Sequence, residues 1–349
     1  MVYIALAICF IASMLITPLV IKLAIKVGAV DKPNERKVHE KLMPRLGGLA
    51  MFISFLIGFL IFIPETIEAW PILLGSIIIV TIGIIDDLKE LSAKTKLAGQ
   101  IAAAVITVLG GIQIEYITWF TGDIIQFGGW AVPLTIVWIV AITNAINLID
   151  GLDGLAAGVS SIVLLTFSAL AISMGNPLVA LLGFIMLGST LGFLVFNFYP
   201  AKIFMGDTGS LFLGYVISVL AVMGLFKNVA IFSLIVPIII LGVPILDTTF
   251  AIIRRIIHKK PLSAPDKFHL HHCLIKLGFT HQQSVIIIYA MSGLFSIAAI
   301  IFTRATLWGS ALLLLALLVI VELIVEVTGL ISEKYRPLLR LMEVSKEKK

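Results

Sequence analysis

The chain has 349 residues, of which 60% are hydrophobic and only 13% are charged. This balance excludes an ordinary soluble protein and predicts that lipid is the solvent. The net charge of +5 is not accompanied by any basic-aromatic recognition pattern. We therefore expect membrane lipid, and no nucleic acid, as a partner.

Apolar segments recur along the chain, and most have or approach the roughly 20 residues with which a helix crosses a bilayer. We predict an all-α, polytopic integral membrane protein with about 11 transmembrane helices in a single domain, residues 1–330, followed by a basic tail, residues 331–349. The expected spans are residues 1–24, 46–63, 70–85, 97–112, 131–146, 155–174, 178–196, 209–223, 229–253, 284–302 and 307–330.

The polar residues gather in the loops that follow odd-numbered spans, so we expect them all on one face. Of the 25 Lys and Arg residues, only Lys227 and Arg304 lie in the other loops. Positively charged loops stay in the cytoplasm, which predicts an outside N-terminus and a cytoplasmic C-terminus. The first span lacks a charged leader and is read as a retained helix. The predicted cytoplasmic loops are residues 25–45, 86–96, 147–154, 197–210 and 254–283.

The first of these loops is basic and contains Arg36, Lys37 and His39. Such a segment serves equally well as a cytoplasmic anchor of the first span or as a phosphate-binding segment. The sequence leaves both interpretations open.

The next loop begins with Asp86 and Asp87 and contains Lys96. Two adjacent carboxylates at a helix end are costly to desolvate unless a cation or a proton relieves them. The alternative is a solvated helix terminus, but further acids on the same face favour a functional site.

Residues 147–154 place Asn147, Asp150 and Asp153 at intervals of three in a glycine-containing turn. If the turn is helical, the three share a face and suit a divalent ion, a sugar or a phosphate. The alternative is a turn in which Asn and Asp satisfy backbone groups.

Residues 197–210 begin with Asn197 and place Asp207 between glycines just before an apolar span. Helix N-terminal amides and small residues allow a phosphate to approach closely there. Asp207 either caps the helix or bridges to phosphate through Mg²⁺, which prefers few carboxylates plus substrate oxygens; Mn²⁺ is the alternative ion.

The longest loop carries His269, His271 and His272, with Cys273 beside them. A zinc site is one reading, but the acids on this face suit Mg²⁺ better. Donors to a diphosphate or sugar are favoured over zinc and over a solvated loop. Further back, Asp247 lies within the ninth span, either as a functional acid or paired with a helix-end Arg.

Together and in this order, these motifs resemble the polyprenyl-phosphate N-acetylhexosamine-1-phosphate transferases. Residues 31–39 and the His-Leu-His-His stretch look like the branch that uses UDP-N-acetylglucosamine (UDP-GlcNAc). Cys273 stands where the phospho-N-acetylmuramoyl-pentapeptide branch has an acid, which argues against that donor. The matching stretches are residues 86–89, 147–154, 197–202, 206–210 and 269–272.

The resemblance implies transfer of a HexNAc-1-phosphate from UDP-GlcNAc to undecaprenyl phosphate, with release of UMP, as the first membrane step of a cell-envelope polysaccharide or teichoic acid. It implies a bacterial cytoplasmic membrane and a site facing the cytoplasm. The resemblance implies that Asp207 is the Mg²⁺ ligand, that Lys96 contacts the diphosphate, and that Asp86 and Asp87 act on the lipid phosphate or the metal. It implies that the nucleotide side is lined by Asn147, Asp150, Asp153 and Asn197. It also implies substrate contacts by Arg36, Lys37 and His39, and contacts to the sugar and its phosphate by His269, His271 and His272.

Three alternatives differ from this interpretation. Another UDP-HexNAc or UDP-MurNAc-pentapeptide would keep the family but change the donor. A CDP-alcohol phosphotransferase needs an Arg after its Asp-Gly motif, where residues 155–158 have none. An ion-coupled secondary transporter would place its acids near the midplane instead of at one edge. The oligomeric state, a homodimer included, is left open.

Overall fold

The computed structural model describes residues 1–31, 42–63, 69–118, 123–224, 235–261, 266, 268–331 and 335–340. Most of them are helical. The helices are α1 (Val2–Val27), α2 (Gly47–Phe62), α3 (Trp70–Lys89), α4 (Ala93–Leu109), α5 (Ala131–Leu148), α6 (Leu155–Ser173), α7 (Pro177–Asn197), α8 (Gly206–Gly224), α9 (Ile235–Ile240), α10 (Gly242–Ile257), α11 (Leu270–Lys276), α12 (His281–Phe302) and α13 (Leu307–Thr328).

Two short antiparallel ribbons interrupt the helices. Strand β1 (Val30–Asp31) pairs with β2 (Met43–Pro44), and β3 (Tyr116–Thr118) pairs with β4 (Ile124–Gln126). The first ribbon follows α1, and the second leads through a short 3₁₀ turn, Gly128–Trp130, into α5. The prediction of a helical fold is therefore confirmed, with strands only in two connections of the described chain.

Within the described residues, eight helices are long and apolar enough to cross a membrane: α1, α3, α5 (with the turn before it), α6, α7, α8, α12 and α13. This establishes a polytopic architecture, although not the eleven spans predicted. Helix α2 is apolar but shorter, at 16 residues, and α4 has 17. Large apolar side chains such as Leu15, Leu312 and Leu318 are exposed on the outer helices, where lipid would cover them.

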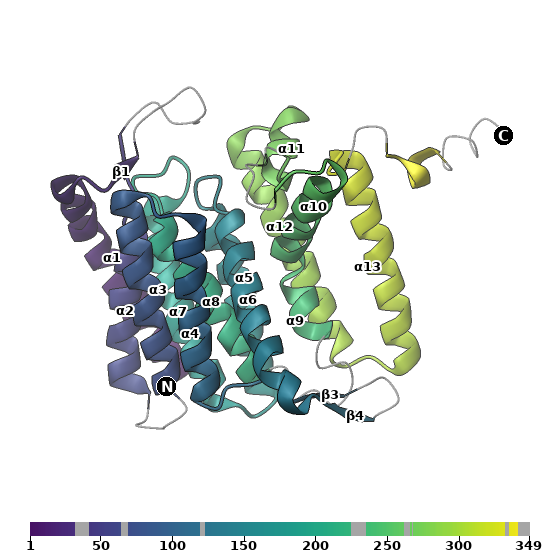
Figure 1. Ribbon diagram of the computed structural model, residues 1–349, viewed down its shortest axis with the longest axis horizontal. Coiled ribbons are helices and arrows are strands. Elements are labelled where there is room, and N and C mark those ends of the chain that lie inside the picture. The colour runs from purple at the N-terminus through teal and green to yellow at the C-terminus, as the bar shows by residue number, and fades with distance from the viewer. Residues whose placement is uncertain are drawn as a thin grey trace.

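The ninth predicted span, residues 229–253, is not one continuous helix. Its described part divides into α9 and α10 at Leu241. Pro244 has no N–H to donate to the carbonyl of Ile240, so the helical hydrogen-bond ladder is interrupted where α9 ends. The prediction of a single helix there is wrong, because Pro244 interrupts the helix without interrupting the apolar run. The interruption lets α10 leave the direction of α9 (Figure 1).

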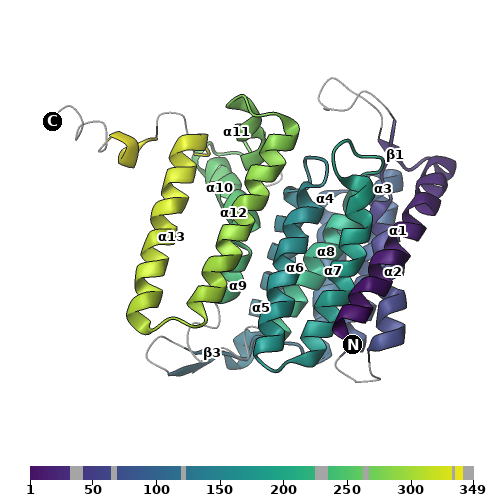
Figure 2. The ribbon, with the colours of Figure 1, turned by 180° about the vertical axis from the view of Figure 1, so that it is seen from behind.

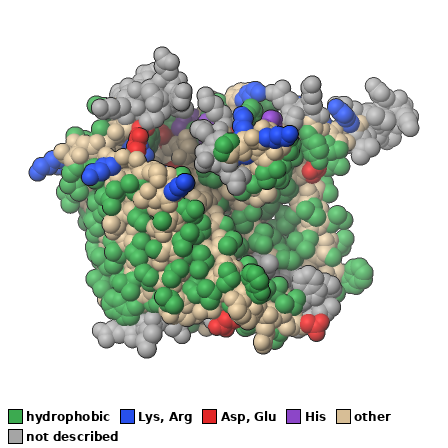
Figure 3. All heavy atoms as spheres, in the orientation of Figure 1, with side chains coloured by type: hydrophobic (Ala, Val, Ile, Leu, Met, Phe, Trp, Pro, Cys, Tyr) green, Lys and Arg blue, Asp and Glu red, His purple; other side chains and the backbone are tan. Residues whose placement is uncertain are grey.

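The polar connections meet at one end of the bundle. Figure 1 shows β1 and α11 at one end, with the N-terminus and the β3–β4 ribbon at the other, and the rear view in Figure 2 agrees. In Figure 3 hydrophobic side chains cover the sides, whereas most visible Lys and Arg side chains lie at the end that carries α11. Among the described residues, basic side chains and α11 therefore gather at one end of the bundle. The side of the membrane that this end faces stays a prediction.

Helix α8 lies in the interior, with nearly all of its residues buried, and contacts α2, α3 and α5. Two glycines allow its first turn to be approached closely. A Cβ at Gly83 of α3 would lie 2.4 Å from Cα of Thr208, and a Cβ at Gly48 of α2 would lie 2.1 Å from the backbone nitrogen of Gly209. Small residues at such crossings let helix backbones pack together in lipid. The start of α8 is thereby held against the end of α3.

Several polar residues lie on helix ends instead of in loops. Helix α3 continues through Asp86 and Asp87 and ends where Glu90 adopts a left-handed conformation, φ 51°. Ser92 then caps α4 by accepting the N–H of Thr95, which places Lys96 in the first turn of α4. Rigid helix ends, and not flexible loops, therefore carry these side chains.

Candidate active site

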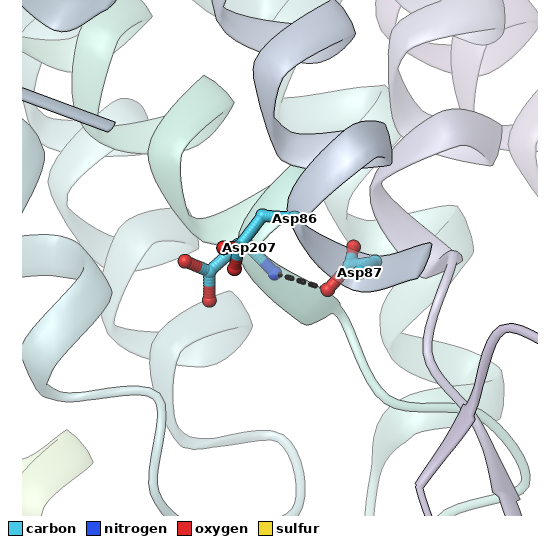
Figure 4. A group of neighbouring side chains, drawn as sticks. All are labelled: Asp86, Asp87 and Asp207. Atoms are coloured by element: carbon cyan, nitrogen blue, oxygen red, sulfur yellow. Dashed lines mark hydrogen bonds between the residues drawn. The ribbon is translucent and has the colours of Figure 1, made fainter. Parts of the chain in front are cut away.

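Asp87 connects the end of α3 to the start of α8. Its Oδ1 accepts the backbone N–H of Asp207 at 3.0 Å, the bond drawn in Figure 4. Its Oδ2 accepts the backbone N–H and the hydroxyl of Thr208 at 3.1 and 2.6 Å. The first N–H groups of a helix lack intrahelical partners and attract negative charge. With Arg45 also 3.5 Å from Oδ1, both oxygens of Asp87 are engaged.

Asp86 and Asp207 share a cation, the ammonium group of Lys96. Its Nζ lies 2.8 Å from Oδ2 of Asp207 and 3.3 Å from Oδ2 of Asp86. The other oxygen of Asp86 accepts the N–H of Leu91 at 2.7 Å. Figure 4 shows these two carboxylates side by side, with that of Asp87 turned away toward the backbone of α8. Two carboxylates this close repel each other unless a positive charge lies between them.

Asn147, in the last turn of α5, completes this group. Its Nδ2 donates to Oγ of Ser210 at 2.8 Å and to Oδ1 of Asp207 at 3.3 Å. Both oxygens of Asp207 are thereby oriented, one by Asn147 and one by Lys96. The ends of α3, α4, α5 and α8 thus each contribute a side chain to one cluster.

The acid cluster fits a divalent metal ion. One oxygen from each of Asp86, Asp87 and Asp207 lies within 4.8 Å of the others. Carboxylate oxygens are the hard ligands that Mg²⁺ takes, together with substrate oxygens. Asp86 and Asp207 direct one oxygen each toward a common cation position near Lys96, whereas Asp87 is occupied by α8. Asp207 and Asp86 are therefore the residues that would hold the ion.

Asp150 lies between α5 and α6, beside this cluster. Burial, followed by the negative charges of Asp207 and Asp87, raises the pKa of its carboxyl to about 7. It accepts no hydrogen bond from any described residue. A carboxyl in this position is open to a ligand, and its predicted role in substrate binding stays a prediction.

Asp153 and Asn197 hold neighbouring loops together. Oδ2 of Asp153 accepts the N–H of Ala201 at 2.9 Å. Asn197 accepts the N–H of Gly154 at 3.1 Å and donates to the carbonyl of Ile203 at 2.9 Å. The turn after α5 is not helical, so the three predicted polar residues do not form one row. The backbone-satisfying alternative fits Asp153, and Asn197 binds backbone groups as well. Asn147 belongs to the cluster and Asp150 lies beside it.

The histidine segment reaches the same loop. A Cβ at Gly151 would lie 2.4 Å from Nε2 of His271, so this ring lies directly against the turn that carries Asp150. Burial and the neighbouring His272 lower the pKa of His271 to about 3, which keeps its ring neutral. The ring centroids of His271 and His272 are 4.2 Å apart. Residues far apart in sequence thus meet beside the acid cluster.

Some contributors were not singled out from the sequence. Ser210 positions Asn147, and Nε2 of His281 accepts the N–H of Asp153 at 2.9 Å. The hydroxyl of Tyr289 donates to the carbonyl of Gly154 at 2.5 Å. An amphipathic pattern cannot identify these residues, because their partners come from distant segments. Arg36, Lys37 and His39 lie outside the described residues.

The fold and the site together define a class: a helical membrane protein with an acid- and histidine-lined site at the polar end of its bundle. The chain belongs to glycosyl transferase family 4. The family model matches residues 69–225, which contain the acid cluster and Asp150.

Relatives extend the match over most of the chain. A Bacillus subtilis protein named probable undecaprenyl-phosphate N-acetylglucosaminyl 1-phosphate transferase is 51% identical, over 96% of this chain and 95% of the relative. A Mycobacterium tuberculosis decaprenyl-phosphate N-acetylglucosaminephosphotransferase is 36% identical, over 79% of this chain and 76% of the relative. A phospho-N-acetylmuramoyl-pentapeptide-transferase of Halalkalibacterium halodurans is 34% identical, over 83% and 94%.

Proposed function

We propose that the protein transfers N-acetylglucosamine 1-phosphate from UDP-GlcNAc to undecaprenyl phosphate, which yields undecaprenyl-diphospho-N-acetylglucosamine and UMP. The observation that carries this proposal is the 51% identity, across nearly the whole chain, to a relative whose name specifies that transfer. The weaker identity to the pentapeptide transferase, 34%, favours the N-acetylglucosamine donor. Both relatives are named as transferases, so neither supports the alternative that the protein is an ion-coupled transporter.

The site's charges suit a reaction between two phosphates. An oxygen of the lipid phosphate attacks the β-phosphorus of the donor, a P–O bond forms, and the bond to UMP breaks. Two anions must meet, so positioning and charge neutralisation are the main requirements. Lys96 supplies one fixed positive charge there. Mg²⁺, held by Asp207 and Asp86, would neutralise charge on the phosphoryl oxygens.

The transfer is proposed to be direct, without an aspartyl intermediate. A lipid phosphate is already an anionic nucleophile and gains little from a covalent relay. Incubation with radiolabelled UDP-GlcNAc in the absence of lipid acceptor should give neither labelled protein nor stoichiometric UMP. Trapped label on the protein would contradict direct attack.

The site's location suits a soluble donor and a membrane-bound acceptor. The acid cluster lies at the polar end of helices that are apolar enough to cross a membrane. We propose that this end faces the cytoplasm of a bacterial cell and that the acceptor's chain stays in the bilayer between helices. Asn147, Asp150 and the histidine segment would then contact the donor from the water side.

The proposal is tested with purified protein in detergent, undecaprenyl phosphate, Mg²⁺ and a panel of donors. UMP release is expected with UDP-GlcNAc and not with UDP-MurNAc-pentapeptide. If only another UDP-HexNAc turned over, the donor assignment would be wrong and the family chemistry would stand. If no donor released UMP, the proposed reaction itself would fail. Omission of Mg²⁺, with EDTA present, should abolish turnover.

A further inference from the structure

Helix α10 presents two charged side chains on one buried face. Asp247 and Arg254 lie about two helical turns apart and therefore on the same side of the helix. Only 2% of Asp247 and 5% of Arg254 is exposed. The sequence left open a pairing of Asp247 with a helix-end Arg, but the structure gives each of them a different partner. Both partners belong to the segment that leads into α11.

Asp247 binds the first residues of the histidine segment. Its Oδ2 lies 2.8 Å from Nδ1 of His269, and its Oδ1 accepts the N–H of Leu270 at 2.7 Å. An ionised carboxylate only accepts hydrogen bonds, so the proton between them belongs to Nδ1. This leaves Nε2 of His269 as the nitrogen available to a ligand. No described residue forms a hydrogen bond with Nε2.

Arg254 fixes the same segment from its other side. Its Nε and Nη2 donate to Oδ2 of Asp266 at 3.1 and 2.6 Å, and its Nη1 donates to the carbonyl of Leu330. Oδ1 of Asp266 accepts the N–H of Phe268 at 3.0 Å. Although burial raises the pKa of Asp266, the hydrogen bonds and charge of Arg254 hold it below its ordinary value. The backbone before His269 is therefore anchored independently of Asp247.

The imidazole rings of His269 and His271 are nearly parallel. The planes of His269 and His271 differ by 4°, with centroids 5.9 Å apart. His271 in turn lies against Gly151, next to Asp150. Asp247 of α10 thus sets the orientation of the His269 ring, and the parallel ring of His271 lies between it and the turn that carries Asp150.

We propose that Asp247 is a positioning residue, which fixes the tautomer and orientation of His269 so that Nε2 meets the phosphate or sugar of the donor. A carboxylate on the far nitrogen of a working histidine has this effect in other sites. The inference rests on the proposed function, because that function supplies the anionic donor. Asp247 is buried within an apolar stretch of sequence, and this role places its effect at the polar end of the bundle.

A double-mutant cycle tests the proposal. The variants are Asp247→Asn, His269→Gln and the double variant, each assayed for kcat and KM with UDP-GlcNAc and undecaprenyl phosphate. Asp247→Asn should lower kcat about 10- to 100-fold and leave KM for the lipid acceptor unchanged. The double variant should be no slower than His269→Gln alone, because Asp247 acts only through that ring.

Glu326→Gln is the matched control. Glu326 is also a fully buried acid, and its two oxygens accept the N–H groups of Leu338 and Leu339 at 2.6 and 2.8 Å, on α13 away from the cluster. This variant removes the same charge from a comparable environment. It should lower the thermal midpoint without changing kcat.

Each outcome decides the matter. Wild-type kcat in Asp247→Asn, or losses that multiply in the double variant, would overturn the positioning role. If Asp247→Asn does not fold, a wild-type rate in His269→Gln would still overturn it, and a loss of kcat with normal folding would uphold it. A wild-type protein that releases no UMP would contradict the proposed function, and the inference would fall with it. Turnover by the wild type with unaffected variants would contradict the inference alone.

Discussion

Asp86 and Asp87 are adjacent and chemically identical, but a helix turns successive side chains by about 100°, so they meet different partners. Asp87 is used by the backbone at the start of α8. Asp86 points to Lys96, beside Asp207. One of the pair therefore maintains the architecture, and the other is available for chemistry.

The same substitution at both positions should separate these roles. Asp87→Asn leaves one oxygen where two N–H groups and a hydroxyl now donate, and we expect a loss of about 1–3 kcal/mol of stability together with activity. Asp86→Asn should lower kcat with little change in the thermal midpoint, because only the Lys96 contact is weakened. Thermal unfolding in detergent and UMP release measure both. Equal midpoints for the two variants would contradict the assignment.

Asp207→Asn tests the metal-binding residue. Loss of the negative charge that Lys96 and Asn147 orient should lower kcat by about 10²–10³-fold and raise the Mg²⁺ concentration needed for half-maximal rate. A Mg²⁺ titration of UMP release measures it. Asp123→Asn is the control, since Asp123 is exposed and directly precedes β4, which lies at the opposite end of the bundle. An unchanged Mg²⁺ requirement in Asp207→Asn would exclude it as a ligand.

The sequence predicted which polar residues lie close together better than it predicted which partners each of them has. Asp86, Asp207, Lys96 and Asn147 lie together as expected, because helix ends on one face of a bundle converge. A backbone-binding role for Asp153 was one of the two readings, but the partners of Asp153 and Asn197 could not be predicted, since they depend on how separate loops fold against each other. The pairing of Asp247 with His269 likewise joins residues 22 positions apart, which a local pattern does not reveal.

At the scale of the helix, the contact between α3 and α8 decides where the acids meet. Thr208 packs directly on Gly83, so the two helices approach at backbone distance. A larger residue there would move Asp207 away from Asp86 and Asp87. The geometry of the cluster thus depends on a residue with no side chain.

Gly83→Ala should therefore impair both folding and activity. The added Cβ would meet Thr208 Cα at 2.4 Å, and overpacking of this kind costs about 1–3 kcal/mol. Gly293→Ala in α12 is the matched control, because nothing lies within 4 Å of its Cβ position. Thermal midpoints and kcat should fall only in the first variant. A neutral Gly83→Ala would show that the helices separate without cost.

The length of the apolar runs predicted that the membrane-spanning helices exist, but it did not predict where each helix begins and ends. The acids at the ends of α3 and α8 were expected in loops because they are polar, yet they lie within helices since their side chains have partners there. Length and hydropathy also overstate continuity, as residues 229–253 show, because a proline breaks the hydrogen-bond ladder without lowering hydropathy much. Tertiary contacts, absent from a periodicity argument, decide both features.

For the molecule as a whole, the gathering of charge at one end predicts its orientation in the membrane. Trp70, Trp130 and Trp308 stand at the starts of α3, α5 and α13. In a membrane protein, tryptophan at helix ends marks the boundary between lipid and water. These three begin helices that run toward the basic end, and so mark the opposite boundary.

Cysteine labelling tests this orientation. Asp123→Cys and Lys260→Cys place exposed thiols at opposite ends, while the native Cys9 and Cys273 are buried. In intact cells a membrane-impermeant maleimide should label Asp123→Cys at once and Lys260→Cys only after permeabilisation. The reverse pattern would place the acid cluster outside the cell.

The hydrogen bonds made by Asp153, Asn197 and Tyr289 hold the loops of the site in place before the donor binds. The connection from α5 to α6, the connection from α7 to α8 and helix α12 are joined by hydrogen bonds between side chains and backbone groups. The conformational entropy of ordering these connections, about 1–2 kcal/mol per residue, is lost once during folding and not at every encounter with a donor. Amide hydrogens around Gly154 and Ala201 should accordingly exchange slowly even before a nucleotide arrives.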